Sequence, residues 1–103
     1  MEQSVVRADP QGTYLESGHF GVILWAEKLE LGKNEFGILR TLMEHPGKII
    51  ERSVLIRNLW ETESFIDDNT LTVNVTRLRR RLEDIGLKNY ILTRKGMGYY
   101  VEE

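Results

Sequence analysis

Residues 68–82 read Asp-Asn-Thr-Leu-Thr-Val-Asn-Val-Thr-Arg-Leu-Arg-Arg-Arg-Leu, and their pattern decides how the rest of the chain is interpreted. Apolar residues recur at i, i+4, i+7 and i+11, which predicts one buried stripe along an α-helix. The stripe comprises Leu71, Val75, Leu78 and Leu82. Asp67 and Asp68 supply an N-cap and complement the helix dipole at its start. Ile85-Gly86 closes the helix, because glycine readily adopts the left-handed conformation of the C′ position.

The face opposite that stripe is unusual for a surface helix. At 100° per residue it presents Asn69, Val73, Thr76, Arg77 and Arg80, with Thr70 and Thr72 on its flanks. A merely solvated face favours Glu and Lys, whereas an exposed valine among threonine, asparagine and arginine suits a DNA major groove. There arginine can pair with guanine and asparagine with adenine, and valine or threonine methyl groups can touch the thymine methyl.

The charge of the chain is distributed unevenly along its 103 residues. The whole chain has a formal net charge of −2, which taken alone argues against a nucleic-acid binder. Residues 69–101, however, hold seven Lys/Arg against two Asp/Glu, a net charge of +5, while residues 1–68 have a net charge of −5. This asymmetry predicts one basic face on an acidic body. A simpler alternative for this charge is a solvated helix face. A separate alternative concerns Arg79 and Arg81, which lie toward the sides of the helix, where either can pair with Glu83 or Asp84.

A sheet and two further helices are predicted before this helix. Segments rich in β-formers and separated by turns predict strands at residues 5–6, 13–15, 20–25 and 28–31. The apolar period then becomes helical at Phe36, Leu39, Leu42 and Met43, until His45-Pro46-Gly47 stops the helix. Residues 48–50 form a brief strand or an extended link, residues 53–60 a short helix, and residues 61–65 a polar loop.

A hairpin is predicted after the arginine-rich helix. Residues 90–93 and 99–101 are strand-like, and residues 94–98 form a basic, glycine-rich turn. Two cations at a hairpin tip can enter a minor groove or grip phosphates. Tyr99 and Tyr100 alternate, so one of them should face the core.

Composition excludes several other classes of protein. The absence of cysteine excludes disulfide scaffolds, thiolate zinc sites and cysteine nucleophiles, and it fits a reducing compartment, so we expect a cytoplasmic location. No stretch approaches the ~18 apolar residues of a membrane span. His19 and His45 lack metal-ligand spacing, and no carboxylate pair is arranged for acid–base work. We therefore expect no cofactor, no metal site and no enzymatic activity.

The order of these elements, together with three stretches of sequence, resembles a known family. Asn-Glu-Phe-Gly-Ile-Leu at 34–39, the helix at 68–82 and Gly-Met-Gly-Tyr at 96–99 resemble the winged-helix effector domain of OmpR/PhoB-type response regulators, most strongly over residues 27–101. The implied fold class is α+β, a winged helix-turn-helix. It has an N-terminal antiparallel sheet at 1–31, a three-helix core at 33–86 with its recognition helix at about 68–82, and a hairpin wing at 90–101.

Two more expectations follow from the resemblance. The helix sequence, together with Asn34, Glu35 and Phe36, is similar to the Bce/Gra group, Gram-positive regulators of cell-envelope and antimicrobial-peptide stress. The regulatory half of the family, a receiver domain with a phosphorylated aspartate, has no counterpart here. We therefore expect an excised effector domain of residues 1–103, with Met1 as an artificial start.

The resemblance also implies roles for individual residues. In the family the third helix enters the major groove and the wing reaches the adjacent minor groove. Candidates near base edges are Thr72, Val73, Thr76 and Arg77. Candidates for DNA backbone contact are Arg52, Trp60, Asn69, Thr70, Asn74, Arg79, Arg80, Thr93 and Tyr99. Independently of the resemblance, Trp60 lies at the end of a short helix, so we expect its ring to lie partly in the core with its indole N–H free for a phosphate. Arg94 or Lys95 would enter the minor groove, and the loop Glu61, Thr62, Glu63, Ser64, Phe65 and Ile66 would meet RNA polymerase. Positions 69 and 76 are often arginine in relatives, so this helix should hold fewer phosphates.

Sequence-specific binding of double-stranded DNA, in control of transcription, is the function these observations favour. The resemblance implies head-to-tail pairs on direct repeats and a cognate sensor kinase acting through the receiver domain. The main alternative is a winged-helix protein-interaction module whose arginine helix binds an acidic partner. RNA binding is weaker, because the aromatic residues are not arranged as an exposed stacking platform.

Overall fold

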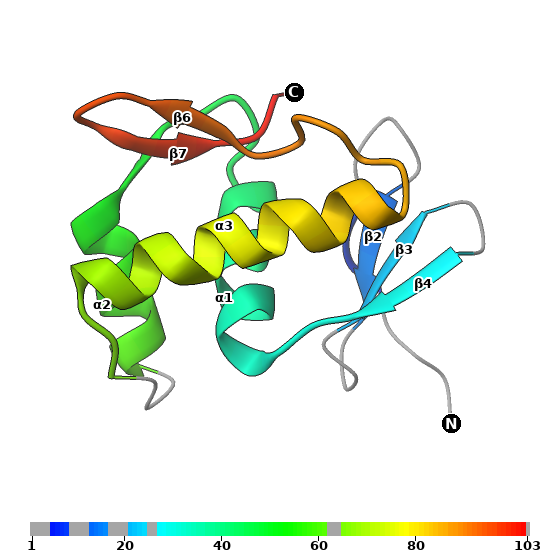
Figure 1. Cartoon of the computed structure of the whole chain (residues 1–103), viewed down its shortest axis with the longest axis horizontal. Helices are drawn as coiled ribbons and strands as arrows, with labels where there is room; N and C mark the ends of the chain where they lie inside the picture. Colours follow the sequence, from blue (N-terminus) through cyan, green and yellow to red (C-terminus); the bar gives the residue numbers. More distant parts are fainter. Residues whose placement is uncertain (1–4, 9–12, 17–20, 25–26, 62–64, 103) are drawn as a thin grey trace.

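Four short strands form the first sheet in the computed structural model, which describes residues 5–8, 13–16, 21–24, 27–61 and 65–102 (Figure 1). The strands are β1 (Val5–Ala8), β2 (Thr13–Glu16), β3 (Gly21–Leu24) and β4 (Glu27–Glu30), and each pairs antiparallel with the next. The predicted N-terminal antiparallel sheet is therefore confirmed. β4 begins and ends one residue before the segment predicted for it.

Helix α1 (Lys33–Met43) follows β4 after a two-residue link. Glu35 accepts a hydrogen bond from the backbone N–H of Gly32 at 2.9 Å, which satisfies a free donor at the helix start. The predicted apolar face is buried together with Ile38, and the helix ends before His45-Pro46-Gly47 as expected. Helix α2 (Arg52–Glu61) is one residue longer at each end than predicted and buries Leu55 and Leu59.

Helix α3 (Asp68–Asp84) is the longest element of the fold. Asp67 is its N-cap and accepts a hydrogen bond from the Thr70 backbone N–H at 2.8 Å. This hydrogen bond holds the pKa of the Asp67 carboxyl below its ordinary value of 3.8. The predicted stripe of Leu71, Val75, Leu78 and Leu82 is at most 1% exposed. Gly86 has φ +93°, so the left-handed glycine predicted at the helix end is also confirmed.

A second, three-stranded sheet carries the hairpin. It consists of β5 (Ile50–Glu51), β6 (Leu92–Arg94) and β7 (Gly98–Tyr100) in the order β5-β7-β6. Residues 50–51 are thus a strand rather than a link, and Ile50 pairs with Tyr99 while Glu51 pairs with Gly98. A Cβ atom on Gly98 would lie 2.0 Å from the carbonyl oxygen of Ile50, so only glycine allows this close approach.

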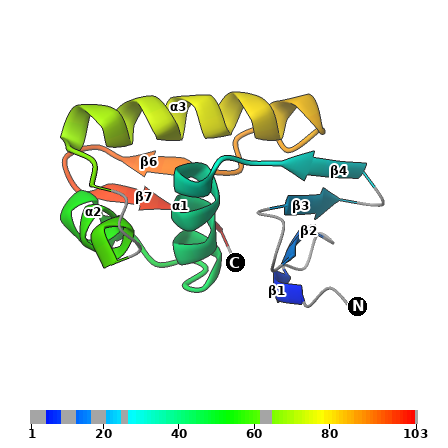
Figure 2. The same ribbon diagram turned by 90° about the horizontal axis from the view of Figure 1, so that it is seen from below.

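The arrangement of the layers leaves one side of α3 open. Figure 2 shows α3 along one side of the molecule, with α1, β6 and β7 beneath it, α2 at one end and the first sheet at the other. The core is formed by the inner faces of the three helices, completed by residues such as Ile50, Ile91 and Tyr99. Within the described part of the chain, no element covers the outer side of α3. No helix there is long and apolar enough to cross a membrane.

Candidate nucleic-acid interface

The outer face of α3 lies in solvent, as its position opposite the buried stripe requires. Its exposed residues are Asn69, Thr70, Thr72, Val73, Thr76, Arg77 and Arg80. Val73 lies at the centre of this face and is 51% exposed, so half of its surface gains no stabilisation from burial against the protein. The surface therefore combines arginine donors, hydroxyl groups and an exposed methyl-bearing side chain on one rigid helix.

The tip of the hairpin presents two further cations, next to an exposed apolar side chain. Arg94, Lys95 and Met97 are exposed, and the backbone N–H of Met97 closes the turn on the Arg94 carbonyl at 2.9 Å. Among the residues that the structure describes, the side chains of Arg94 and Lys95 have no hydrogen-bond or ion-pair partner, and the same holds for Arg77 and Arg80. These four cations are available to an anionic ligand.

An open groove of about 530 Å³ separates the start of α2 from the hairpin tip. It is lined by Glu51, Arg52, Ser53, Ile56, Arg57, Trp60, Asp68 and Met97. Sequence reasoning missed Arg57 and Met97 as part of this surface. Arg57 lies three residues before Trp60 on α2, so helical spacing could have placed the two on one face. Met97 could not be placed in this way, because its position depends on how the hairpin packs.

Arg52 and Arg79, both predicted to contact the DNA backbone, are bonded within the protein. Arg52 donates to the Tyr99 hydroxyl at 2.6 Å and to Oδ1 of Asp68 at 3.0 Å. Arg79 donates to the Ile91 carbonyl at 3.0 Å and to the hydroxyl of Thr93. Tyr99 is only 5% exposed, which confirms that one of the paired tyrosines faces the core. Contact of these residues with DNA stays a prediction.

The alternative in which Arg79 and Arg81 pair with Glu83 or Asp84 is wrong. Arg81 lies on the flank of α3 that meets α1 and β4, so its guanidinium reaches Oε1 of Glu35 at 3.3 Å and the carbonyl oxygen of Glu30. Glu35 is 3% exposed, and its second carboxylate oxygen is buried without a hydrogen-bond partner among the described residues. Arg81 therefore neutralises a buried carboxylate instead of serving the outer face.

Two other candidates donate side-chain hydrogen bonds within the protein. Trp60 was expected to have a free indole N–H, and this is wrong, because the group donates to the Ile66 carbonyl at 3.1 Å. Trp60 as a whole is 52% exposed, and its ring meets Phe65 edge-on at 5.5 Å between ring centroids. Asn74 is 8% exposed and its amide donates to the Thr70 carbonyl at 2.8 Å.

The loop predicted at 61–66 is only partly described. Glu61 belongs to α2, Phe65 is 70% exposed and Ile66 is buried. Thr62, Glu63 and Ser64 lie outside the described residues.

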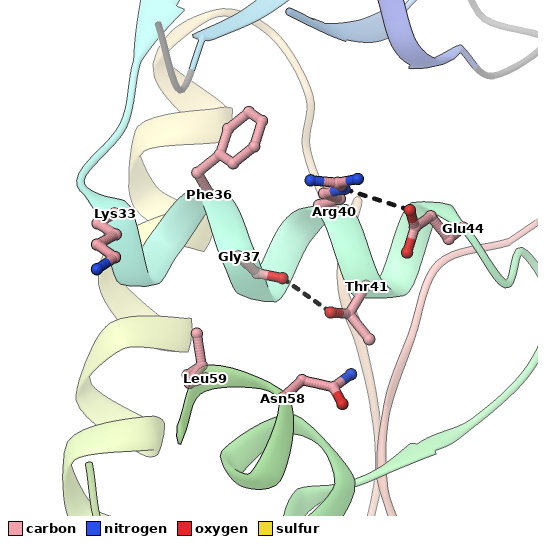
Figure 3. Close-up of a pocket in the computed structure, with 8 residues that line it drawn as sticks. All are labelled: Lys33, Phe36, Gly37, Arg40, Thr41, Glu44, Asn58 and Leu59. Carbon is pink, nitrogen blue, oxygen red and sulfur yellow. Dashed lines mark hydrogen bonds and ion pairs between the residues drawn. The ribbon is translucent and has the colours of Figure 1, made fainter. Parts of the chain in front are cut away.

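A second cavity, of about 250 Å³, lies between α1 and α2 and is separate from this surface (Figure 3). Its lining includes no residue of α3 or of the hairpin. Two polar side chains of α1 that line it are bonded locally: Thr41 donates to the Gly37 carbonyl at 2.9 Å, and Arg40 pairs with Glu44, just after the helix, at 3.2 Å. Among the described residues, no group of three or more His, Cys, Asp or Glu side chains is placed to hold a metal.

The family model described as "Transcriptional regulatory protein, C terminal" matches residues 26–101. The chain belongs to this family. It is a family of DNA-binding transcription regulator domains and not an enzyme family, and the OmpR/PhoB-type winged-helix fold predicted from the sequence is confirmed.

Relatives and solved structures agree with this assignment. The sensory transduction protein BceR of Halalkalibacterium halodurans is 55% identical over 87 residues, which cover 84% of this chain and 35% of BceR. The predicted similarity to the Bce/Gra group is thereby confirmed, and the chain spans about a third of the length of this relative. The C-terminal domain of the nisin resistance regulator NsrR, a lantibiotic response regulator, is 35% identical with a TM-score of 0.83, covering 94% of this chain and 98% of that domain.

A third comparison concerns a domain solved with its DNA. The DNA-binding domain of Klebsiella pneumoniae RstA, in complex with the RstA box, is 26% identical with a TM-score of 0.73. The match covers 99% of this chain and 98% of the RstA domain.

Proposed function

We propose that this domain binds double-stranded DNA sequence-specifically, with α3 in the major groove and the hairpin tip in the adjacent minor groove. The observation that carries the proposal is the uncovered outer face of α3, where Val73, Thr76 and Arg77 are exposed together. A solvated helix face gives no reason for an exposed valine at its centre, whereas the methyl groups of a major groove do. The membership of the family and the RstA domain solved with DNA support the same function.

The four residues predicted to contact bases present different chemical groups to the DNA. Arg77 presents an unpartnered guanidinium that can bind the two acceptors of guanine, and Val73 presents methyl groups to thymine. The Thr76 hydroxyl can contact either kind of base pair. The Thr72 hydroxyl already donates to the Asp68 carbonyl at 3.2 Å and accepts from Arg52, so its methyl group is the part left for a base.

Phosphate binding is proposed for residues around these base contacts. Asn69, Thr70 and Arg80 lie on the outer face of α3 beside the base contacts, and Arg94 and Lys95 lie at the hairpin tip. If Arg80, Arg94 and Lys95 each neutralise a phosphate, the logarithm of the binding constant should fall against the logarithm of salt concentration with a slope of about −3. A slope near zero would contradict a DNA-binding role for these cations.

The proposed role of the whole protein follows its relatives. BceR is a sensory transduction protein and NsrR a lantibiotic response regulator, so we propose that this domain is the effector part of a two-component response regulator. It would act in the cytoplasm, without catalysis, in control of transcription and antibiotic resistance. A receiver domain outside residues 1–103 would couple it to a sensor kinase, and residues 61–66 would meet RNA polymerase. Two copies would bind head to tail on direct repeats.

The test is a selection from a random pool of DNA duplexes, read by gel shift. We expect recovery of duplexes that contain a direct repeat, bound more tightly than the starting pool. An acidic polypeptide such as polyglutamate serves as the competing ligand for the protein-interaction alternative. Selection of no sequence, together with equal binding to polyglutamate, would overturn the proposed function. The Lys33→Ala variant is the control for removal of a cation away from the outer face of α3. It should select the same duplexes as the unsubstituted domain, because Lys33 lines the separate cavity between α1 and α2.

A further inference from the structure

Arg52, the first residue of α2, has four of the five N–H donors of an arginine occupied inside the protein. Its Nε donates to Oδ1 of Asp68 at 3.0 Å, and Nη1 donates to the Tyr99 hydroxyl at 2.6 Å. Its Nη2 donates to the Asp68 carbonyl at 2.7 Å and to the Thr72 hydroxyl at 2.8 Å. One guanidinium therefore joins the start of α2, the first turns of α3 and strand β7.

Arg79 connects a later turn of α3 to the same hairpin. Its Nε donates to the Ile91 carbonyl at 3.0 Å, just before β6, and its Nη2 donates to the hydroxyl of Thr93 in β6. The guanidinium carbons of Arg79 and Arg52 lie 5.6 Å and 5.7 Å from the centroid of the Tyr99 ring. Both distances are within cation–π range. The Tyr99 ring is 5% exposed, whereas the Arg52 side chain is 33% exposed, so water is kept from the ring and only partly from the guanidinium groups.

The hairpin needs such contacts, because its backbone pairing is short. β6 and β7 have three residues each, and β5 adds only two. A two-stranded hairpin is marginally stable alone, so side chains must fix its angle to α3. The proposed function requires that angle to be constant, since α3 and the hairpin tip are to enter neighbouring grooves of one duplex.

We propose that Arg52 and Arg79 are positioning residues, which set the angle between α3 and the hairpin by holding Tyr99 and Thr93. The proposal rests on the proposed function and departs from the resemblance, which places both arginines on DNA phosphates. Phosphate binding falls instead to the unpartnered cations Arg80, Arg94 and Lys95.

The opposite arrangement is that both arginines leave their protein partners for phosphates when DNA binds. The two arrangements differ in an observable quantity. A cation that binds a phosphate displaces a counterion, so its removal lowers the salt slope by about 0.9. A cation that only holds the hairpin displaces none, so its removal lowers affinity while the slope stays constant.

The experiment measures binding of the intact domain at several KCl concentrations, to the duplex selected from the random pool and to a random-sequence duplex. The variants are Arg52→Gln, Arg79→Gln and Arg79→Lys, and Arg80→Gln is the matched control from the adjacent, unpartnered position. We expect all three variants to lose affinity for the selected duplex by about tenfold or more, because charge-assisted hydrogen bonds that fix the hairpin are lost. Their salt slopes should equal that of the unsubstituted domain, whereas Arg80→Gln lowers the slope by about 0.9 on both duplexes.

Arg79→Lys separates geometry from charge. Lysine keeps the positive charge and cannot form the planar fork that reaches both Ile91 and Thr93. Near-normal affinity for Arg79→Lys, or a slope lowered by about 0.9 in the two glutamine variants, would overturn the proposal and leave the proposed function standing. Failure of the unsubstituted domain to bind any duplex would instead count against the proposed function.

Tyr99→Phe decides the matter if the arginine variants do not fold. It removes one hydroxyl, the acceptor of Arg52 Nη1, and changes no charge. We expect the amides of β6 and β7 to exchange hydrogen faster than in the unsubstituted domain, and affinity for the selected duplex to fall at an unchanged salt slope. Unchanged exchange together with unchanged affinity would overturn the proposal.

Discussion

The outer face of α3 and its two flanks all carry arginine, but in the part of the chain that the structure describes only the arginines of the flanks bind other elements of the protein. Arg79, Arg80 and Arg81 are consecutive, and successive residues of a helix point 100° apart. Arg79 bonds to the hairpin, Arg81 bonds to Glu35 and Glu30, and Arg80 has no side-chain partner among the described residues. The flanks use charge to join elements, and the outer face keeps it available. A count of basic residues therefore overstates the charge available to DNA.

The largest expected effect tests whether the hairpin is held against the core through β5. Gly98→Ala places a methyl group 2.0 Å from the Ile50 carbonyl oxygen, so the pairing of β5 with β7 must open. We expect the free energy of unfolding to fall by about 3 kcal/mol, measured by urea denaturation.

Gly96→Ala is the control for this change. Gly96 has φ +77° and open space around its Cβ position, so only backbone strain of about 1 kcal/mol is expected. Equal losses for the two variants would mean that strain, and not the contact with β5, explains the effect.

The next effect compares a flank of α3 directly with its outer face. Arg81→Ala leaves the Glu35 carboxylate, 3% exposed, without its cation, and should cost about 2 kcal/mol because Arg81 itself is partly exposed. Arg80→Ala removes a solvated side chain and should change stability by less than about 0.5 kcal/mol. Urea denaturation of both variants measures the two changes in the free energy of unfolding. Similar losses would contradict the conclusion that arginines on the flanks of α3 join elements while those on the outer face do not.

Arg77→Ala tests the outer face by DNA affinity rather than stability. We expect a loss of about 1–3 kcal/mol on the selected duplex and a much smaller loss on random DNA, because a bidentate contact to guanine disappears. Gel-shift titration of both duplexes measures the difference. Equal losses of affinity for the two duplexes would mean that Arg77 contacts a phosphate instead of a base.

The smallest effect concerns the N-terminal end of α3. The hydrogen bond from Thr70 lowers the pKa of Asp67, so the ionised carboxylate stabilises the fold at pH values above its ordinary pKa of 3.8. This contribution is lost as the pH falls through the lower pKa of the folded state. Asp67→Ala should therefore melt at a lower temperature than the unsubstituted domain at about pH 7, and the difference in melting temperature should shrink as the pH is lowered below 3.8. A difference that is constant with pH would contradict the role of the ionised cap.

Much of the fold could be predicted from local patterns. The stripe of Leu71, Val75, Leu78 and Leu82, the cap at Asp67 and the left-handed Gly86 are properties of one helix, and all were confirmed. The pairing of β5 with β7 could not be predicted, since it joins residues far apart in sequence and depends on a glycine contact. The confirmed family resemblance rests on the same local patterns, taken in order.

The candidate interface likewise has features that local patterns predict and features that they do not. The exposure of Val73, Thr76 and Arg77 follows from helical period alone. The partners of Trp60 and Arg81 did not follow, because their nearest acceptors, the Ile66 carbonyl and the Glu35 carboxylate, belong to other segments.

The sequence by itself determined the helices, the α3 face that is buried and the family, because each depends on the spacing of residues within a few turns. Only the tertiary structure decided which cations are available to a ligand. A long, flexible arginine takes the strongest acceptor within reach, and that acceptor is supplied by whichever element packs beside it. For Arg52 these are Asp68 and Tyr99, for Arg79 they are Ile91 and Thr93, and for Arg80 there is none among the described residues.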